Sequence, residues 1–402
     1  MTPEIKQRIE QIRQGEVPEG YKKGKLGIVP EEWNETSFST LFTSTSEYTD
    51  DLDKYPLYSL TIEDGVTPKT ERYERSHLVK KEDSYKIVRP NDYAYNPMNL
   101  RFGAVARHKG DMPVAVSGYY DIFTTVHERN LPFMDSFLTC GPMITYYNRV
   151  STGSLVEKQR VHFSQFLEFM LPLPSINERT KIATILTTQD RVIELKEKRL
   201  AEKQRQKKYL VQQLLTGKKR LPGFAFEVEK TNIKAISTYS VSTISQTMLE
   251  CYEGKQLYPV FNANSIAGYV DFYENECPYI SIIKDGAGIG RVRLCEAKSS
   301  TIGTMGCIHA RKGISIIFLY YLLEQVDFNK YSNGSTIPHL YYKDYSCEKV
   351  RIPDIKEQAA IAEVLSTADR EIELLQQDIE QEKQKKKALM QLLLTGIARV
   401  KT

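Results

Sequence analysis

The sequence lacks the features that mark several common classes of protein. Its six cysteines include no Cys-x-x-Cys pair, and none has a histidine at zinc-ligand spacing, which predicts reduced thiols and no structural metal. No apolar run reaches the roughly 18 residues of a membrane span, and the N-terminus has no signal-peptide core. We therefore expect a soluble, cytoplasmic protein without metal or cofactor.

Catalytic motifs are also scarce. The six histidines are scattered, with no His-Glu-x-x-His pair and no triad partner. Residues 96–99, Asn-Pro-Met-Asn, begin like the Asn/Asp-Pro-Pro-Tyr/Phe signature of methyltransferases but lack its second proline and its aromatic residue. No Gly-Lys-Ser/Thr follows the glycine-rich residues 285–290, which favours a tight turn between strands over a nucleotide-binding loop. The sequence therefore predicts a non-catalytic protein.

The chain does have enough apolar sequence for packed cores. It contains 402 residues, of which 41% are hydrophobic and 10% are aromatic, and this length allows two or three domains. Its net charge of +4 permits nucleic-acid binding without requiring it. Composition alone leaves the function open.

One stretch of the chain occurs twice. Residues 174–217 and 353–396 align without a gap, and 20 of the 44 positions are identical. Each copy opens with a proline and a capping box, Ser175 to Glu178 or Asp354 to Glu357, and closes on Leu-Leu-Thr-Gly, whose glycine suits a helix C-terminus. Because no other proline or glycine interrupts either copy, we expect two long helices of roughly 40 residues.

Apolar residues recur in these helices at alternating spacings of three and four. They form a narrow stripe from Ile182 to Leu214, apolar at both ends and charged in the middle, and another from Ile361 to Leu393. Such stripes are typical of a two-helix coiled coil. The cationic residues 196–208 of the first copy match the more acidic residues 378–382 of the second. We therefore expect the copies to pair, and the alternative is a solvated amphipathic helix on a larger domain.

The segments outside the helices contain short strand-like runs separated by Gly, Pro, Asn and Asp. We expect strands at residues 55–62, 85–88, 104–107, 114–116 and 120–126, and again at 258–261, 269–273, 279–284, 290–295 and 306–310. We expect shorter helices at residues 3–13 and 315–325, and partly helical structure at 131–147. The expected domains are 1–173 (N-terminal helix and first module), 174–217 (first long helix), 218–352 (second module) and 353–402 (second long helix).

This alternation of module and helix, with Pro-x-Ile-x-Glu at the start and Leu-Leu-Thr-Gly at the end of both helices, resembles the DNA-specificity subunit of type I restriction-modification systems. The resemblance covers essentially the whole chain. The first copy departs slightly, with Glu178-Arg179 where the second has Glu357-Gln358.

The resemblance implies an α+β fold with a pseudo-twofold internal repeat. Two mixed α/β target recognition domains would be joined by two long antiparallel coiled-coil helices. Each domain would read one half of an asymmetric, bipartite site in double-stranded DNA. The helices would dock two methyltransferase subunits and support recruitment of restriction subunits.

DNA contacts should come from loops that carry Arg, Lys, Asn, Gln or Tyr, because base edges need paired donors and acceptors while phosphates need positive charge. For each such residue the alternative is packing or solvated surface. The candidates are Lys22, Lys23, Tyr95, Asn96, Asn99, Arg101, Arg107, Tyr119 and Tyr120 in the first module, and Lys284, Arg291, Arg293, Asn333, Ser335, His339, Tyr341 and Lys343 in the second. The apolar helix flank expected to bind methyltransferase consists of Ile185, Val192, Leu195 and Val364.

Two other functions remain open at this point. A coiled-coil assembly protein whose modules bind other proteins could have the same helices, but it would lack salt-dependent binding to a random DNA duplex. A DNA nuclease is less favoured. Asp285 and the triplet Glu296-Ala297-Lys298 have the residue types of a magnesium site, yet the first module has no equivalent.

Overall fold

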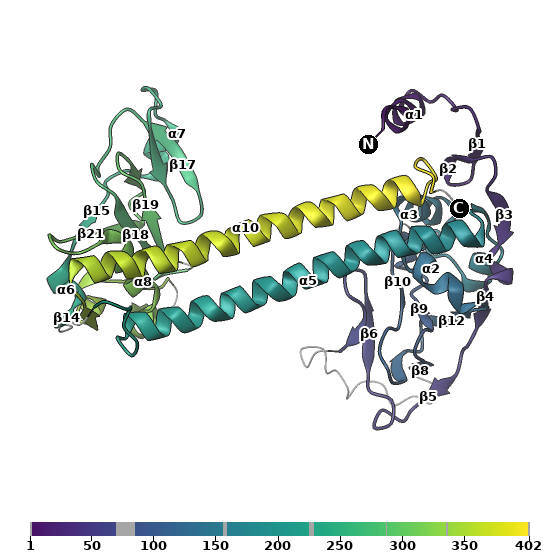
Figure 1. Cartoon of the computed structure of the whole chain (residues 1–402), viewed down its shortest axis with the longest axis horizontal. Helices are drawn as coiled ribbons and strands as arrows, with labels where there is room; N and C mark the ends of the chain where they lie inside the picture. Colours follow the sequence, from purple (N-terminus) through teal and green to yellow (C-terminus); the bar gives the residue numbers. More distant parts are fainter. Residues whose placement is uncertain are drawn as a thin grey trace. The chain divides into compact units, whose positions relative to one another are not determined.

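The computed structural model of the chain describes residues 2–69, 85–155, 159–224, 229–286, 288–334 and 337–400. The chain divides into two compact units, residues 1–196 with 378–402 (unit 1) and residues 197–377 (unit 2). Figure 1 shows both long helices in sequence colours, α5 (Ile176–Leu215) in teal and α10 (Ile355–Leu393) in yellow. The division runs through these helices, so each unit contains one part of each.

Unit 1 opens with the helix α1 (Pro3–Arg13) and a hairpin of β1 (Tyr21–Gly24) and β2 (Gly27–Pro30). The Thr2 hydroxyl accepts a hydrogen bond from the Ile5 amide at 3.4 Å, and Pro3 occupies the first turn, as is common at helix starts. The predicted helix at residues 3–13 is confirmed. The hairpin was not predicted.

The rest of unit 1 is mostly antiparallel sheet. A ribbon joins β3 to β13, a four-stranded sheet has the order β10-β9-β12-β4, and a three-stranded sheet has the order β11-β8-β5. The elements are β3 (Asn34–Ser37), β4 (Phe42–Ser44), β5 (Tyr48–Thr49), β6 (Tyr58–Thr61), β7 (Gly65–Pro68), β8 (Tyr85–Val88), β9 (Tyr93–Tyr95), β10 (Val105–Arg107), β11 (Val114–Ser117), β12 (Asp121–Thr125), α2 (Leu131–Phe137), α3 (Gly141–Val150), α4 (Phe163–Leu167) and β13 (Met170–Leu173).

Aromatic side chains fill the core of unit 1. The Phe123 ring stacks on Tyr93 with centroids 5.1 Å apart and meets Phe42 edge-on at 5.0 Å. Tyr93 and Tyr95 share this core because residues two apart on a strand point to the same side. The prediction that Tyr95 lies on a DNA-facing loop is therefore wrong, since Tyr95 belongs to β9 and is fully buried.

Unit 2 repeats the ribbon and the four-stranded sheet of this frame, whereas its three-stranded sheet contains a parallel pair, β16 with β20. Its ribbon joins β14 to β24, its four-stranded sheet has the order β15-β21-β18-β19, and its three-stranded sheet has the order β17-β16-β20. The elements are β14 (Glu229–Asn232), α6 (Ile233–Ile236), β15 (Ser237–Val241), α7 (Gln246–Glu250), β16 (Tyr258–Phe261), β17 (Ile266–Val270), β18 (Tyr279–Ile283), β19 (Val292–Cys295), β20 (Ser300–Thr301), β21 (Met305–Ala310), α8 (Ile316–Glu324), β22 (Ser332–Asn333), β23 (His339–Leu340), α9 (Tyr342–Tyr345) and β24 (Lys349–Ile352).

The helix α8 packs beside the first turns of α10 in the core of unit 2 (Figure 1). Most predicted strands match observed ones within a few residues. The predicted strand at 269–273 is displaced, because β17 ends at Val270.

Both long helices start and stop where their capping residues predict. The Ser175 hydroxyl accepts from the Glu178 amide at 3.3 Å, and the Asp354 carboxylate accepts from the Lys356 amide at 2.9 Å. At the other end, Gly217 and Gly396 have φ angles of 69° and 72°. Glycine adopts this left-handed conformation without the strain that a Cβ would add, so it ends the helix.

Ion pairs show that the two helices run antiparallel within each unit. In unit 1, Lys196 bonds Asp378 at 2.8 Å and Glu382 at 2.9 Å, while further along α10 Lys386 bonds Asp190 at 2.5 Å. In unit 2, Lys203 bonds Glu371 at 2.6 Å and Lys207 bonds Asp369 at 2.5 Å. The expected attraction between residues 196–208 and 378–382 is thus present at Lys196.

A buried glutamate anchors the first turn of each long helix. In unit 1, Glu178 accepts from Arg399 at 2.8 Å and from the Trp33 indole at 3.3 Å. In unit 2, the equivalent Glu357 accepts from Arg220 Nε at 2.7 Å. Arg220 and Arg399 lie three residues beyond Gly217 and Gly396, so the connector that follows each long helix returns to the start of the other.

Candidate nucleic-acid interface

The connection between β9 and β10 in unit 1 corresponds to that between β18 and β19 in unit 2, because the two four-stranded sheets share one strand order. Asn96, Asn99 and Arg101 lie on the first connection, and Lys284 and Arg291 lie on the second. Sequence reasoning therefore chose equivalent places in both modules. The two connections differ in how many of their polar side chains are exposed to solvent.

In unit 1 this connection is packed down. The Asn96 side chain is buried and accepts from the Met98 and Asn99 amides, which fixes the turn. The Arg101 guanidinium donates to Gln159 at 3.3 Å and lies over the Phe102 ring, while its Nε is buried without a hydrogen-bond partner among the described residues. Only Asn99 among the three candidates is well exposed.

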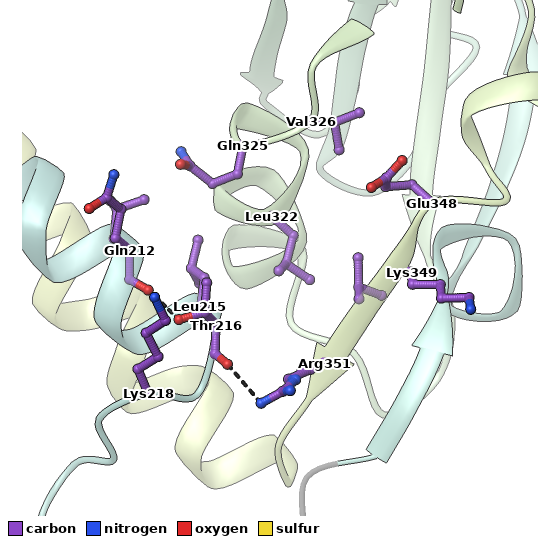
Figure 2. Close-up of a pocket in the computed structure, with 12 residues that line it drawn as sticks. Gln212, Leu215, Thr216, Lys218, Leu322, Gln325, Val326, Glu348, Lys349 and Arg351 are labelled. Carbon is purple, nitrogen blue, oxygen red and sulfur yellow. Dashed lines mark hydrogen bonds between the residues drawn. The ribbon is translucent and has the colours of Figure 1, made fainter. Parts of the chain in front are cut away.

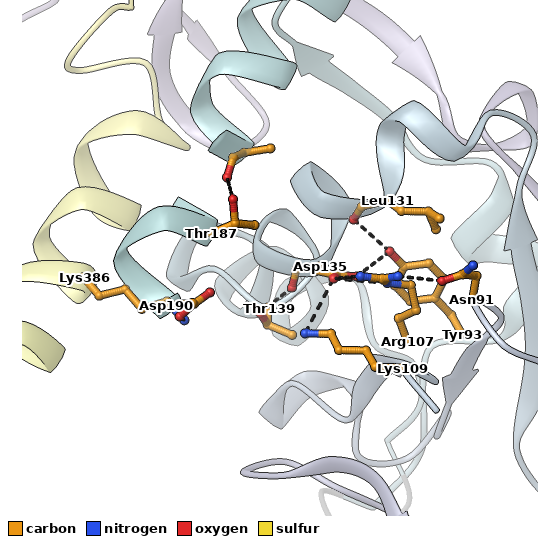
Figure 3. A network of polar contacts seen from close by, with 11 residues as sticks. Asn91, Tyr93, Arg107, Lys109, Leu131, Asp135, Thr139, Thr187, Asp190 and Lys386 are labelled. Carbon is orange, nitrogen blue, oxygen red and sulfur yellow. Dashed lines mark hydrogen bonds and ion pairs between the residues drawn. The ribbon is translucent and has the colours of Figure 1, made fainter. Parts of the chain in front are cut away.

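Arg107 belongs to a network at the edge of the same sheet (Figure 3). It makes a two-pronged pair with Asp135, Nε to Oδ1 at 2.9 Å and Nη2 to Oδ2 at 2.7 Å, and Tyr93 donates to the same carboxylate at 2.7 Å. Burial disfavours the charged form, yet the hydrogen bonds and attraction of Asp135 leave the pKa of Arg107 raised. Asp135 neutralises the charge of Arg107, and the guanidinium is already bonded to Asp135 and Asn91. The structure therefore does not support the prediction that Arg107 contacts DNA.

The Arg107 network lines a hollow of about 310 Å³. Lys109 also lines it, and its amino group lies 3.7 Å from Asp135. Three cationic or hydroxyl groups therefore converge on one carboxylate. This arrangement rigidifies the end of β10 and leaves Lys109, which is largely exposed, as the group of the network that can still reach a ligand.

Of the other candidates in unit 1, two are held within the fold and two are exposed at the surface. The Lys22 amino group donates to the carbonyl oxygens of Glu31 and Trp33, so it fastens the hairpin. Tyr120 is half-buried, and burial raises its pKa. Lys23 and Tyr119 are exposed and stay available as predicted contacts.

In unit 2, the β18–β19 connection and the β22–β23 region meet at Asp285. Its carboxylate bonds Lys284 Nζ at 2.5 Å and His339 Nδ1 at 2.7 Å, and the backbone of Leu340 bonds Lys284 at 2.8 Å. Burial favours the protonated acid, but the hydrogen bonds from Lys284 and His339 outweigh it and lower the pKa of Asp285. The structure thus brings together two predicted residues, Lys284 and His339, that lie far apart in sequence.

Exposed side chains surround this junction. Arg291 donates to Asn264 at 3.2 Å, Arg293 lies over the Phe261 ring at 5.2 Å, and Lys343 lies over the Tyr341 ring at 5.5 Å. The predicted contacts that are exposed here are Arg291, Arg293, Asn333, Tyr341 and Lys343. Ser335 lies outside the described residues.

Sequence reasoning missed the roles of three residues at these sites. Asp135 binds Arg107, Asn264 accepts from Arg291, and Asp285 joins two loops. Acidic and amide groups carry no local signal for this role, because Arg107, Arg291 and His339, which bond them, lie 28, 27 and 54 positions away. The described residues contain no group of three or more His, Cys, Asp or Glu arranged to hold a metal ion. Asp285, the main carboxylate of the nuclease alternative, is occupied by Lys284 and His339.

The predicted methyltransferase flank is only partly exposed. Ile185 and Leu195 are exposed on α5, and Val192 is half-buried. Val364 packs against the core of unit 2, so its predicted role in partner binding is not supported by its environment. None of the described helices is long and apolar enough to cross a membrane.

Comparisons with known proteins show which proteins this chain resembles. Residues 227–384 match the family described as the type I restriction modification DNA specificity domain. The MjaX specificity subunit assigned to the type I restriction enzymes of Methanocaldococcus jannaschii is 24% identical over 426 aligned positions, covering 96% of this chain and 98% of that protein. The chain is thus similar to the specificity subunits of type I restriction enzymes.

Solved structures agree with this specificity-subunit fold. The S subunit of a type I restriction-modification system from M. genitalium matches with a TM-score of 0.58 and 15% identity, covering 92% of this chain and 97% of that one. A chain from a structure that describes complex assembly and conformational transition of a type I system matches with a TM-score of 0.56 and 13% identity, covering 92% and 99%. The α+β fold expected from the resemblance is confirmed.

Proposed function

We propose that this specificity subunit binds an asymmetric, bipartite DNA sequence, with one half-site read by each unit. In the same proposal it has no catalytic site of its own, and it acts on cytoplasmic DNA by holding two methyltransferase subunits, through which restriction subunits join. The observation that supports this best is the repeated frame with unlike surfaces. Equivalent connections carry Asn99 and Arg101 in unit 1 and Lys284 and Arg291 in unit 2, where His339 of β23 also joins the site through Asp285.

Unlike surfaces on like frames favour two different half-sites. Identical modules related by a twofold axis would read a palindrome, whereas these modules offer different donors and acceptors to the bases. We assign base contacts to the exposed Asn99 and Tyr119 in unit 1 and to Arg291, Arg293 and Tyr341 in unit 2. Lys23, Lys109 and Lys343 are assigned to phosphates.

Methylation mapping tests the proposal. The chain is expressed with its methyltransferase in a host that lacks other modification, and methylated bases are located by single-molecule sequencing. We expect one motif made of two unlike specified parts separated by unspecified bases. A continuous motif would contradict reading by two separate units.

Binding measurements then separate this function from a protein-assembly role. Affinity for duplexes altered in one half-site, measured at several salt concentrations, should fall for each half separately and should decrease with salt. A chain that ignores duplex DNA at low salt while still binding the methyltransferase would be an assembly protein.

A further inference from the structure

The end of α5 and the strand β24 enclose an open groove in unit 2 of about 550 Å³ (Figure 2). Its floor is apolar and includes Leu215, Leu322 and Val350, while Lys218, Lys349 and Arg351 stand on its rim. We call this the unit 2 groove. The described residues give no carboxylate partner to any of the three rim cations, and the nearby Glu348 is engaged by the Tyr331 hydroxyl.

The ribbon beside the groove is strongly cationic on one face. Lys230 lies directly opposite Arg351, and Asn232 lies directly opposite Lys349, so these four side chains share a face. Like charges directly across a strand pair are destabilising. Val350, which lies in the groove floor, points to the other face of β24, so an acidic group at the edge of the groove beside Arg351 and Lys349 would relieve this repulsion.

In unit 1, the site that corresponds to the unit 2 groove is covered by a segment of the chain itself. The offset of 179 residues relates Lys349 to Met170, Arg351 to Pro172, and Gly217 to Gly396. In unit 1 the β1–β2 hairpin covers these positions: Lys25 Nζ donates to the Met170 carbonyl at 2.9 Å, and Tyr21 donates to the Gly396 carbonyl at 2.8 Å.

Further contacts seat the same hairpin. A Cβ built on Gly24 would lie 3.5 Å from Pro172 Cγ, and Leu26 packs against the core of unit 1. The site in unit 1 is therefore closed by a polypeptide segment that combines an apolar anchor with hydrogen bonds. The described part of unit 2 has the groove and no hairpin over it.

We propose that the unit 2 groove binds an acidic segment of the methyltransferase subunit, anchored by an apolar side chain. This inference rests on the proposed function. The apolar floor favours a polypeptide over the sugar–phosphate backbone of DNA, because phosphates would satisfy only the rim. The rim cations select carboxylates, and the hairpin of unit 1 provides the precedent for a polypeptide occupant.

Because unit 1 fills its own equivalent site, the groove serves one of the two methyltransferase subunits and not the other. The test uses the full chain with Lys218→Glu and Lys349→Glu together. The control carries Lys234→Glu and Lys312→Glu, which make the same charge change at exposed positions of unit 2. Methyltransferase binding and stoichiometry are measured by titration with native mass spectrometry.

We expect the groove variant to bind one methyltransferase normally and the second about tenfold or more weakly, and the control to bind both normally. A photo-crosslinking residue at the exposed rim position Gln325 should react with an acidic segment of the methyltransferase, whereas one at Gln246 should not. Unchanged binding by the groove variant, or a crosslink to DNA, would overturn the assignment. Failure of the unaltered chain to bind any methyltransferase would instead refute the proposed function.

Discussion

The two units share the order of their four-stranded sheets, yet the equivalent connection is packed against the protein in unit 1 and exposed in unit 2. In unit 1 the β9–β10 connection is packed down, with Asn96 buried and Arg101 held by Gln159. In unit 2 the β18–β19 connection leaves Arg291 exposed and pairs through Asp285 with His339 on a separate strand. A duplicated frame therefore fixes where a reading surface lies but not which groups it presents.

The first turns of the two long helices, in contrast, are built alike. Glu178 and Glu357 are equally buried and each is met by the arginine that follows the other helix. Their surroundings differ, since Trp33 also donates to Glu178 and Arg399 also bonds Glu32. Repeated sequence thus gives repeated chemistry, while sequence outside the repeats supplies the differences.

Exchanging one module is the strongest way to test the independence of the two surfaces. Residues 36–171 are replaced by the corresponding module of a relative. The cut points Thr36 and Leu171 are direct partners in the β3–β13 ribbon, so the exchange keeps the ribbon closed. We expect one half-site to change completely and the other to stay the same in methylation mapping. A change in both would show that the units do not read separately.

Removing the arginine at each helix start should have the next largest effect. Breaking a buried ion pair costs about 3–5 kcal/mol, and we expect about 2 kcal/mol for Arg399→Ala because Arg399 is partly exposed and Trp33 still donates to Glu178. Arg220→Ala should lower the urea midpoint further, since it removes the guanidinium that donates to Glu357, and no indole donates to Glu357 among the described residues. Arg205→Ala, at an exposed position of α5, is the control. Equal losses for Arg220 and Arg399 would remove the difference attributed to Trp33.

The long helices could be predicted from sequence because every signal for them is local. Proline, a capping residue and a terminal glycine bracket each helix, and apolar residues recur at heptad spacing towards both ends of each. The β1–β2 hairpin and the β3–β13 ribbon were missed. The ribbon pairs Asn34 with Leu173 across the whole module, and no local pattern encodes such a partner.

The sequence predicted which connections carry the candidate site, but it did not predict which of their side chains are exposed. Tyr93 and Tyr95 are aromatic residues that favour strands, yet Tyr95 was chosen as a loop candidate because a tyrosine hydroxyl can contact DNA. Arg107 has the residue type of a base reader, but its partner Asp135 lies 28 positions away and claims the guanidinium. Residue type therefore identified which side chains can bind DNA, and burial decided which remain free to do so.

The contrast between the two connections predicts unlike arginine effects. Arg291→Ala should weaken binding to the specific duplex by about 1–3 kcal/mol and relax the sequence preference at one position of its half-site. Arg101→Ala should chiefly lower stability, because that side chain bridges to Gln159 and packs on Phe102. Fluorescence anisotropy with half-site variants and urea unfolding separate the two outcomes. A uniform loss for Arg291→Ala across all sequences would assign it to phosphate.

The smallest expected effect concerns pH and the helix pair of unit 1. Hydrogen bonds from Lys196, Gln189 and Lys385 lower the pKa of Glu382 to about 2, whereas the unfolded value is near the ordinary about 4.5. A depressed carboxyl pKa stabilises the folded state fully above the unfolded pKa, and this contribution is lost as the pH falls toward the folded pKa. The stability difference between the unaltered chain and Glu382→Gln, from urea unfolding, should stay constant above about pH 5.5 and shrink steadily toward about pH 2.

The matching test in unit 2 uses Glu371, whose pKa is lowered by its hydrogen bond to Lys203. Glu382 accepts from three side chains and Glu371 is held mainly by one, so Glu371→Gln should change stability less over the same acid range. Added salt should reduce the difference for Glu371 more, because its ion pair with Lys203 is the more exposed of the two sites. If both variants instead lost stability equally and at the same pH, the three-donor arrangement around Glu382 would confer no advantage over a single ion pair.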